Sequence, residues 1–263
     1  MRLYPEPMPA ARLVAFDLDD TLTPSKSPIH PEMAEALTAL LAVVPVCIIS
    51  GGQLEQFTTQ VTERLELDDG ARSRLHLMPT CGTRYYRYDD DGDLREVYAH
   101  DLSAEERAEA LSVVEREARR LGLWEEQTWG PALEDRGSQI TFSALGQQAP
   151  LGAKRAWDPT GEKKEQLRAA VAPLLPELEV RSGGSTSIDI TRQGVDKAYG
   201  MTRLAEHTGI DLADMLFIGD RLDEGGNDYP VKAMGVPCIA VDGWEDAART
   251  VRTLVAEVAA AAR

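Results

Sequence analysis

The sequence predicts an α/β fold in which a doubly wound parallel sheet is interrupted by an inserted α+β domain. Short apolar runs alternate with helical patterns at both ends of the chain, as in parallel strands joined by crossover helices. In the middle, strand patterns follow one another through turns, which is typical of antiparallel sheets. We therefore expect a core of residues 1–84 and 193–263 and an inserted cap of residues 85–192.

The first part of the core has the pattern βαβαβ. Apolar runs at residues 12–16, 44–49 and 74–78 predict three short buried strands. Helical patterns at residues 30–42 and 54–67 separate them. Both connections are long enough for parallel strands.

The pattern changes at Thr83, where polar and aromatic residues alternate on either side of the turn DDDGD. This pattern predicts a hairpin, and we expect a new sheet to begin there. Ser103 and Glu106 form a capping box for a following surface helix that ends near Gly122. Further strands are expected at residues 137–144, 178–183 and 185–191, with a helix at residues 162–172.

The parallel pattern resumes after residue 193. A helical segment at residues 194–209 is followed by an apolar strand at residues 214–219 and a short helix. Residues 237–241 predict one more strand, and an alanine-rich helix follows it. The same sheet is therefore expected to continue after the insertion.

Charge and cysteine content limit the classes of function. A formal charge of −16 on 263 residues opposes binding to nucleic acid and to anionic membranes, so we expect neither partner. Cys47, Cys81 and Cys238 are far apart and predict neither a disulfide framework nor a thiolate zinc site. The first residues contain three prolines instead of the apolar run of a signal peptide, and we expect a cytoplasmic protein.

Reactive side chains follow three of the predicted strands. Asp17 comes after the first strand, Ser50 after the second and Asp220 after the strand at residues 214–219. Because the carboxyl ends of parallel strands meet at one edge of a sheet, these groups should converge. Lys197 adds a cation at a predicted helix start, and Asp228 adds another acid. This inventory predicts phosphoryl transfer with Mg²⁺ as cofactor.

The chemistry assigns a role to each group. Asp17 and Asp220 offer the hard carboxylate oxygens that Mg²⁺ prefers. Asp17 is the expected nucleophile and forms an aspartyl phosphate, while Asp19 exchanges a proton with the leaving and accepting oxygens. The groups expected to bind the phosphate oxygens are Ser50, the amides of Gly51 and Gly52, and Lys197.

The order of these motifs resembles the haloacid dehalogenase superfamily, in its capped branch, subfamily IIB. Within that branch the chain is most similar to eukaryotic-type phosphomannomutases, in DLDDTLTPSKSPI, SGGQLEQF, GGSTSIDIT followed by GVDKAYG, and GDRLDEGGND. The resemblance implies a magnesium held by Asp17, the backbone carbonyl of Asp19 and Asp220, with Asp228 supporting that shell. It also implies a small phosphate ester, a hexose phosphate, as substrate.

The resemblance further implies sugar-phosphate contacts from Lys26, Arg136, Ser187 and Asp189. One cap arginine of the family is displaced here, to Lys154 or Arg155 in PLGAKR. On that ground we expect a sugar-phosphate phosphatase. A phosphomannomutase is the alternative, and a receiver-like domain phosphorylated on Asp17 is a remote one.

Overall fold

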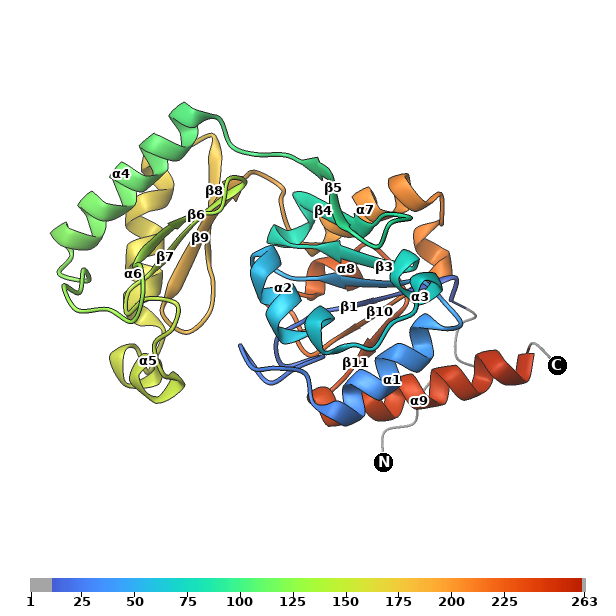
Figure 1. The fold of residues 1–263 in the computed structure, drawn as a ribbon. Coiled ribbons are helices and arrows are strands. Elements are labelled where there is room, and N and C mark those ends of the chain that lie inside the picture. Colours follow the sequence, from blue (N-terminus) through green and yellow to red (C-terminus); the bar gives the residue numbers. More distant parts are fainter. Residues whose placement is uncertain (1–10, 262–263) are drawn as a thin grey trace. The chain divides into compact units, whose positions relative to one another are not determined.

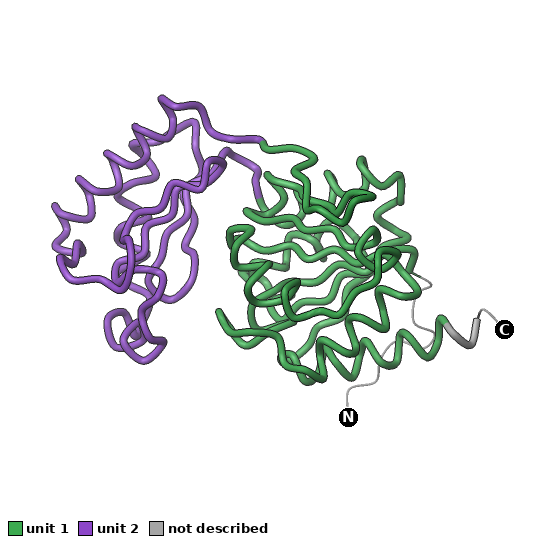
Figure 2. Tube along the Cα trace, in the orientation of Figure 1, with its two compact units in different colours: residues 1–99, 196–263 green, residues 100–195 purple. Residues whose placement is uncertain are grey.

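The computed structural model describes residues 11–261, and the chain divides into two compact units (Figure 2). One unit contains residues 1–99 and 196–263, and the other contains residues 100–195. The predicted boundaries at 84/85 and 192/193 therefore move to 99/100 and 195/196. Residues 1–10, which carry the prolines used in the expectation about location, lie outside the described residues.

The core unit combines a parallel sheet with an antiparallel hairpin. Its described strands lie in the order β11-β10-β1-β2-β3-β4-β5, and those from β11 to β3 are parallel (Figure 1). The strands and helices are β1 (Leu13–Phe16), α1 (Pro31–Leu41), β2 (Val46–Ile49), α2 (Leu54–Gln60), α3 (Asp69–Ser73), β3 (Leu75–Met78), β4 (Arg84–Tyr88), β5 (Leu94–Ala99), α7 (Lys197–Thr208), β10 (Met215–Gly219), α8 (Tyr229–Ala233), β11 (Cys238–Ala240) and α9 (Trp244–Ala261).

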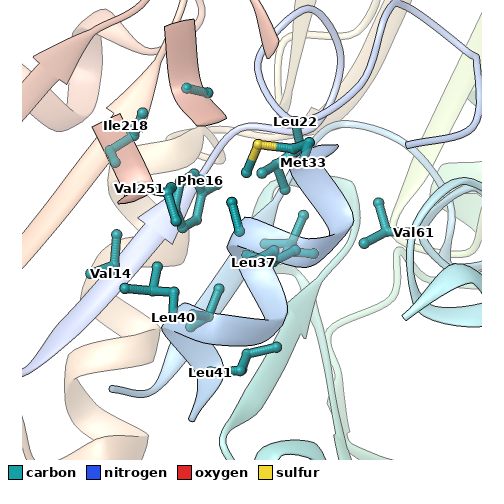
Figure 3. Packing of buried hydrophobic residues seen from close by; sticks show 14 of the residues in the cluster. Val14, Phe16, Leu22, Met33, Leu37, Leu40, Leu41, Val61, Ile218 and Val251 are labelled. Carbon is teal, nitrogen blue, oxygen red and sulfur yellow. The ribbon is translucent and has the colours of Figure 1, made fainter. Parts of the chain in front are cut away.

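Alternate residues of the parallel strands face opposite sides of the sheet, because side chains in a strand alternate with period two. Val14 and Phe16 of β1 belong to one apolar cluster with residues of α1 and α9, and Figure 3 shows Phe16 beside Val251 of α9. Leu13 and Ala15 lie in a second apolar cluster, which includes Met201 of α7. The sheet is therefore covered on both faces, and the predicted doubly wound core is confirmed.

The hairpin of β4 and β5 belongs to the core sheet, so the prediction that a new sheet begins at Thr83 is wrong. β4 pairs with β3 in antiparallel fashion, with Leu77 opposite Tyr86. Tyr85 is buried, and its Oη lies 2.6 Å from Nδ1 of His76 on β3. Burial of this tyrosine against the core explains why the hairpin extends the first sheet.

The cap unit is a four-stranded antiparallel sheet with helices, as the sequence predicts. Its strand order is β6-β7-β9-β8, and α4 and α6 contribute to the same apolar cluster as the sheet. Its elements are α4 (Ala104–Arg120), β6 (Leu133–Asp135), β7 (Gln139–Ser143), α5 (Leu151–Trp157), α6 (Glu162–Val171), β8 (Leu178–Ser182) and β9 (Ser187–Arg192). The predicted capping box of Ser103 and Glu106 begins α4. Short β6 and α5 were not predicted.

Close backbone packing places α7 against the turn that follows β3. A Cβ atom at Gly200 would lie 2.3 Å from Cδ1 of Ile49 and 2.7 Å from the carbonyl oxygen of Cys81. Only glycine fits this approach without a shift of the backbone.

Among the described helices, none is long and apolar enough to span a membrane.

We predict that Gly200→Ala lowers the free energy of unfolding by about 1–3 kcal/mol, because the added methyl group overpacks a buried contact. Gly70→Ala, in α3 of the same unit, is the matched control because its Cβ meets nothing closer than 3.4 Å. It should be neutral or stabilising by up to about 1 kcal/mol through helix propensity. Urea unfolding measures both. Equal stabilities of the two variants would show that the contact at Gly200 relaxes freely.

Candidate active site

Asp17, Ser50 and Asp220 lie directly after three adjacent parallel strands. Phe16 is paired with both Ile48 and Ile218, so the carboxyl ends of β1, β2 and β10 are level (Figure 1). The amide of Asp17 donates a hydrogen bond of 3.0 Å to the carbonyl oxygen of Ile218. The sheet register therefore brings these predicted site residues to one edge.

Lys197 joins two of the acids in a buried ion triad. Its Nζ lies 2.5 Å from Oδ1 of Asp17 and 2.5 Å from Oδ1 of Asp228. Lys197 is 1% exposed and Asp228 is 0% exposed, so water does not screen these contacts. α7 begins at Lys197, and the side chain of Asp196 caps this helix by accepting from the amide of Tyr199.

Asp17, Asp220 and Asp228 form a carboxylate cluster. One oxygen from each lies within 4.8 Å of the other two. Oδ1 of Asp220 accepts a 3.2 Å hydrogen bond from Thr21, and Oδ2 of Asp228 accepts one of 3.0 Å from the amide of Arg221. Such hard oxygens fit a divalent cation of the magnesium type.

Asp228, and not Asp223, belongs to this cluster. Asp223 has an exposed side chain and pairs with Arg221 at 3.3 Å. Gly219 leaves room for Asp228, since a Cβ there would lie 2.4 Å from Oδ2 of Asp228.

Burial and neighbouring charges together set the pKa values of the site. Burial raises the pKa of Asp17 above its usual range, although the neighbouring Lys197 lowers it. Burial alone would lower the pKa of Lys197, but the carboxylates of Asp17 and Asp228 outweigh that effect and raise it. Burial and the charge of Asp228 raise the pKa of Asp220. Three acidic side chains surround a single ammonium group, so the binding of a further cation at this site would offset the remaining negative charge.

Ser50, Gly51 and Gly52 form a turn that is tied to the segment after β3. The amide of Cys81 donates to the carbonyl oxygen of Ser50, and the amide of Thr80 donates to that of Gly52, both at 2.9 Å. The amide of Gly52, predicted to bind phosphate, donates to Oγ of Ser50 at 3.3 Å. The turn lies beside the triad because it follows β2, the neighbour of β1.

The side chain of Asp19 has partners outside the carboxylate cluster. Its Oδ1 accepts from the amide of Lys26, and its Oδ2 accepts from Nε2 of Gln56, both at 2.7 Å. Lys26 thus meets Asp19 through its backbone. Gln56 was not predicted as a site residue, because one glutamine in an amphipathic helix gives no distinguishing signal.

Ser187 and Asp189 of the cap lie on the sheet face that is turned away from α4 and α6. Their neighbours Ile188 and Ile190 belong to the apolar cluster under those helices, so the alternate residues face the other way. Oδ1 of Asp189 accepts hydrogen bonds from Gln139 and Thr141, and Oγ of Ser187 lies 3.1 Å from Oγ of Ser143. Arg136 follows β6 and pairs with Glu134 at 2.6 Å.

Lys154 and Arg155, the alternatives for the displaced arginine, have different surroundings in α5. Lys154 is buried, and its Nζ donates to the carbonyl oxygen of Gln147 at 2.9 Å. Arg155 is exposed and lines a cavity of about 780 Å³ that also contains Lys164 and Glu165. Arg155 is therefore the more accessible of the two.

We predict that Lys197→Met lowers the free energy of unfolding by about 3–5 kcal/mol, because two buried carboxylates lose their shared cation. Lys232→Met is the control, since Lys232 is exposed in the same unit and its Nζ makes one hydrogen bond of 3.3 Å, to the carbonyl oxygen of Leu222. Its loss should cost at most about 1 kcal/mol. Urea unfolding at pH 7 in the presence of a chelator measures both. If Lys197→Met unfolds at the same urea concentration as the control, the triad does not stabilise the core.

Comparisons with known proteins agree with this geometry. The family model of the haloacid dehalogenase-like hydrolases matches residues 153–231. The phosphomannomutase of Schizosaccharomyces pombe is 28% identical over 83% of this chain and 84% of its own. That of Spinacia oleracea is 26% identical over 85% of this chain and 87% of its own.

Solved structures share the fold. A haloacid dehalogenase-like hydrolase from Bacteroides thetaiotaomicron covers 93% of this chain and 99% of its own, with a TM-score of 0.64 and 15% identity. Trehalose-6-phosphate phosphatase from Aspergillus fumigatus covers 94% of each chain, with a TM-score of 0.55 and 19% identity. The chain is therefore similar to haloacid dehalogenase-like hydrolases and to phosphomannomutases, as its motifs predict, and this similarity indicates an enzyme.

Proposed function

We propose that this enzyme transfers the phosphoryl group of a hexose phosphate through an aspartyl phosphate on Asp17. The observation that carries the proposal is the buried triad of Asp17, Lys197 and Asp228, with Asp220 beside it. A carboxylate held by an ammonium at a strand end is positioned to attack an electrophile. The sugar-phosphate substrates implied by the names of the relatives support the choice of ester.

The first half of the reaction breaks the sugar O–P bond. One carboxylate oxygen of Asp17 forms a bond to phosphorus as the sugar oxygen leaves with its electron pair and takes a proton from Asp19. Lys197 offsets the negative charge that spreads over the phosphoryl oxygens, and the turn at Ser50 binds those oxygens. In the second half, Asp19 removes a proton from the acceptor, which attacks phosphorus and frees Asp17.

Mg²⁺ is the proposed cofactor, held by Asp17, Asp220 and the carbonyl oxygen of Asp19. When bound, it neutralises phosphate charge. Asp228 is assigned a supporting role, because its two oxygens already accept from Lys197 and from the amide of Arg221. Asp228 thereby fixes the ammonium group that faces Asp17.

The acceptor decides between a mutase and a phosphatase. Phosphomannomutase relatives that cover most of the chain favour the mutase over the hydrolysis expected from the sequence, so we place mutase activity first. Hydrolysis is the second candidate. A mutase needs cap cations to hold the distal phosphate, but the side chain of Lys154 donates to a backbone carbonyl and that of Arg136 is paired with Glu134. A phosphatase does not need these cations to hold a second phosphate.

A cytoplasmic location is part of the proposal. Cys47, Cys81 and Cys238 all lie within the described residues, and each is a free thiol. Free cysteines suit a reducing compartment.

Metal removal tests the cofactor. We predict that a chelator abolishes turnover of glucose 1-phosphate and that Mg²⁺ restores it. Asp220→Asn should raise the Mg²⁺ concentration needed for half-maximal activity by about 10-fold or more, because one anionic ligand is lost. Asp223→Asn is the matched control outside the cluster. Full activity in chelator would refute the proposed cofactor.

Product analysis tests the reaction. Purified protein with Mg²⁺ receives mannose 1-phosphate or glucose 1-phosphate, with and without the matching 1,6-bisphosphate, and free phosphate and 6-phosphate are followed together. We expect 6-phosphate to exceed free phosphate when the bisphosphate is present. Asp17→Asn should lower either product by several orders of magnitude, because the nucleophile is lost.

Each outcome of the product analysis has one meaning. Free phosphate in excess with bisphosphate present would reject the mutase and support the phosphatase. Unchanged turnover in Asp17→Asn would reject the aspartyl phosphate itself.

A further inference from the structure

The loop between β1 and α1 is folded tightly around the side chain of Asp19. The amide of Asp20 donates to the carbonyl oxygen of Thr23 at 2.7 Å, and the amide of Ser25 donates to Oδ1 of Asp20 at 3.1 Å. Lys26 has a φ of 54°, in the left-handed region of the backbone that residues other than glycine seldom adopt. In this conformation its amide donates to Oδ1 of Asp19 at 2.7 Å.

Gln56 donates to the other oxygen of the same carboxylate. It lies in the first turn of α2, and its Nε2 is 2.7 Å from Oδ2 of Asp19. The two contacts differ in kind, since the one from Lys26 comes from the backbone and the one from Gln56 comes from a side chain. Rotation of the Asp19 carboxylate would break both, so together they select one rotamer.

α2 is itself fixed to the loop one turn after Gln56. Gln60 is buried, and its Oε1 accepts from Oγ1 of Thr23 at 3.1 Å. The carbonyl oxygen of Gln60 also accepts from the amide of Ile29 at 2.8 Å. Gln56 therefore projects from an element that cannot shift independently of the loop, which is what precise positioning of a catalytic group requires.

The side-chain amide of Gln56 also packs against Gly52 of the predicted phosphate-binding turn. A Cβ at Gly52 would lie 2.2 Å from Oε1 of Gln56 and 2.8 Å from its Cδ. One side chain thus contacts both the turn predicted to bind phosphate and the carboxylate predicted to move the proton. The distance between these two groups is set in part by Gln56.

We propose that Gln56 is a positioning residue for Asp19, an inference that rests on the proposed function. It holds the carboxylate in the rotamer from which Asp19 gives a proton to the leaving sugar oxygen and later removes one from the acceptor. Proton transfer requires a heavy-atom distance of about 2.6–3.2 Å, so a carboxylate free to rotate transfers protons less often.

The test compares two leaving groups. A sugar oxygen is a poor leaving group and needs a proton, whereas p-nitrophenolate leaves without one. Gln56→Leu removes the donor, and Gln56→Met removes it while keeping the length of the side chain. Both should lower kcat/KM for glucose 1-phosphate, which reports transfer of the phosphoryl group to Asp17, by about 10- to 100-fold, part of what acid–base catalysis supplies. The kcat/KM for p-nitrophenyl phosphate should change less than about 3-fold, because this leaving group needs no proton.

Glu55→Gln is the matched control, because Glu55 is the neighbouring exposed residue of α2. It should leave both activities unchanged. The double variant of Gln56→Leu and Asp19→Asn gives a second readout. If Gln56 acts through Asp19, its loss adds less than about 2-fold to the effect of Asp19→Asn. A merely structural role would make the two losses multiply.

Three results would overturn the inference: equal losses on both esters, losses that multiply with Asp19→Asn, or faster turnover of glucose 1-phosphate in Gln56→Leu. The last would mean that Gln56 holds Asp19 away from its task. If Gln56→Leu does not fold by urea unfolding, Gln56→Met, which keeps the length of the side chain, decides. Failure of the proposed function is distinct, because Asp17→Asn would then leave the turnover of both esters unchanged.

Discussion

The buried contact of Lys197 with Asp17 and Asp228 is the interaction on which the rest of the core depends. An unpaired buried ammonium costs several kcal/mol, and two carboxylates left without it cost more. The three residues come from the start of the chain and from two segments after the insertion. The triad therefore joins the two parts of the core, and it forms only if the chain returns to the sheet in one register.

Glycines make that return possible. Gly200 lets α7 approach the turn at Cys81, and Gly219 makes room for the carboxylate of Asp228. Around this frame the loop after β1 is tied by backbone hydrogen bonds and by two glutamines of α2. Such a site is organised before substrate arrives, so its groups need little reorganisation during a reaction. The left-handed backbone conformation of Lys26 is strained, and this strain is one cost of organising the loop in advance.

The cap is built on a different principle. Its sheet has one apolar face, packed under α4 and α6, and one polar face. On the polar face the acids and bases already have protein partners, such as Arg136 with Glu134 and Asp189 with Thr141. A substrate that bound there would exchange one set of polar contacts for another. Under the proposed function, discrimination between the hydroxyl patterns of sugars would follow from which of these contacts are replaced.

The sequence by itself determined the parallel core and the convergence of Asp17, Ser50 and Asp220. Buried parallel strands are continuous apolar runs, and their carboxyl ends must meet. The sequence could not decide which sheet receives the hairpin at residues 84–99, because alternating strands specify a face and not a partner. Burial of Tyr85 beside His76 decided it. The contact of Gln56 with Asp19 likewise arises only in the tertiary structure, since it joins side chains 37 residues apart.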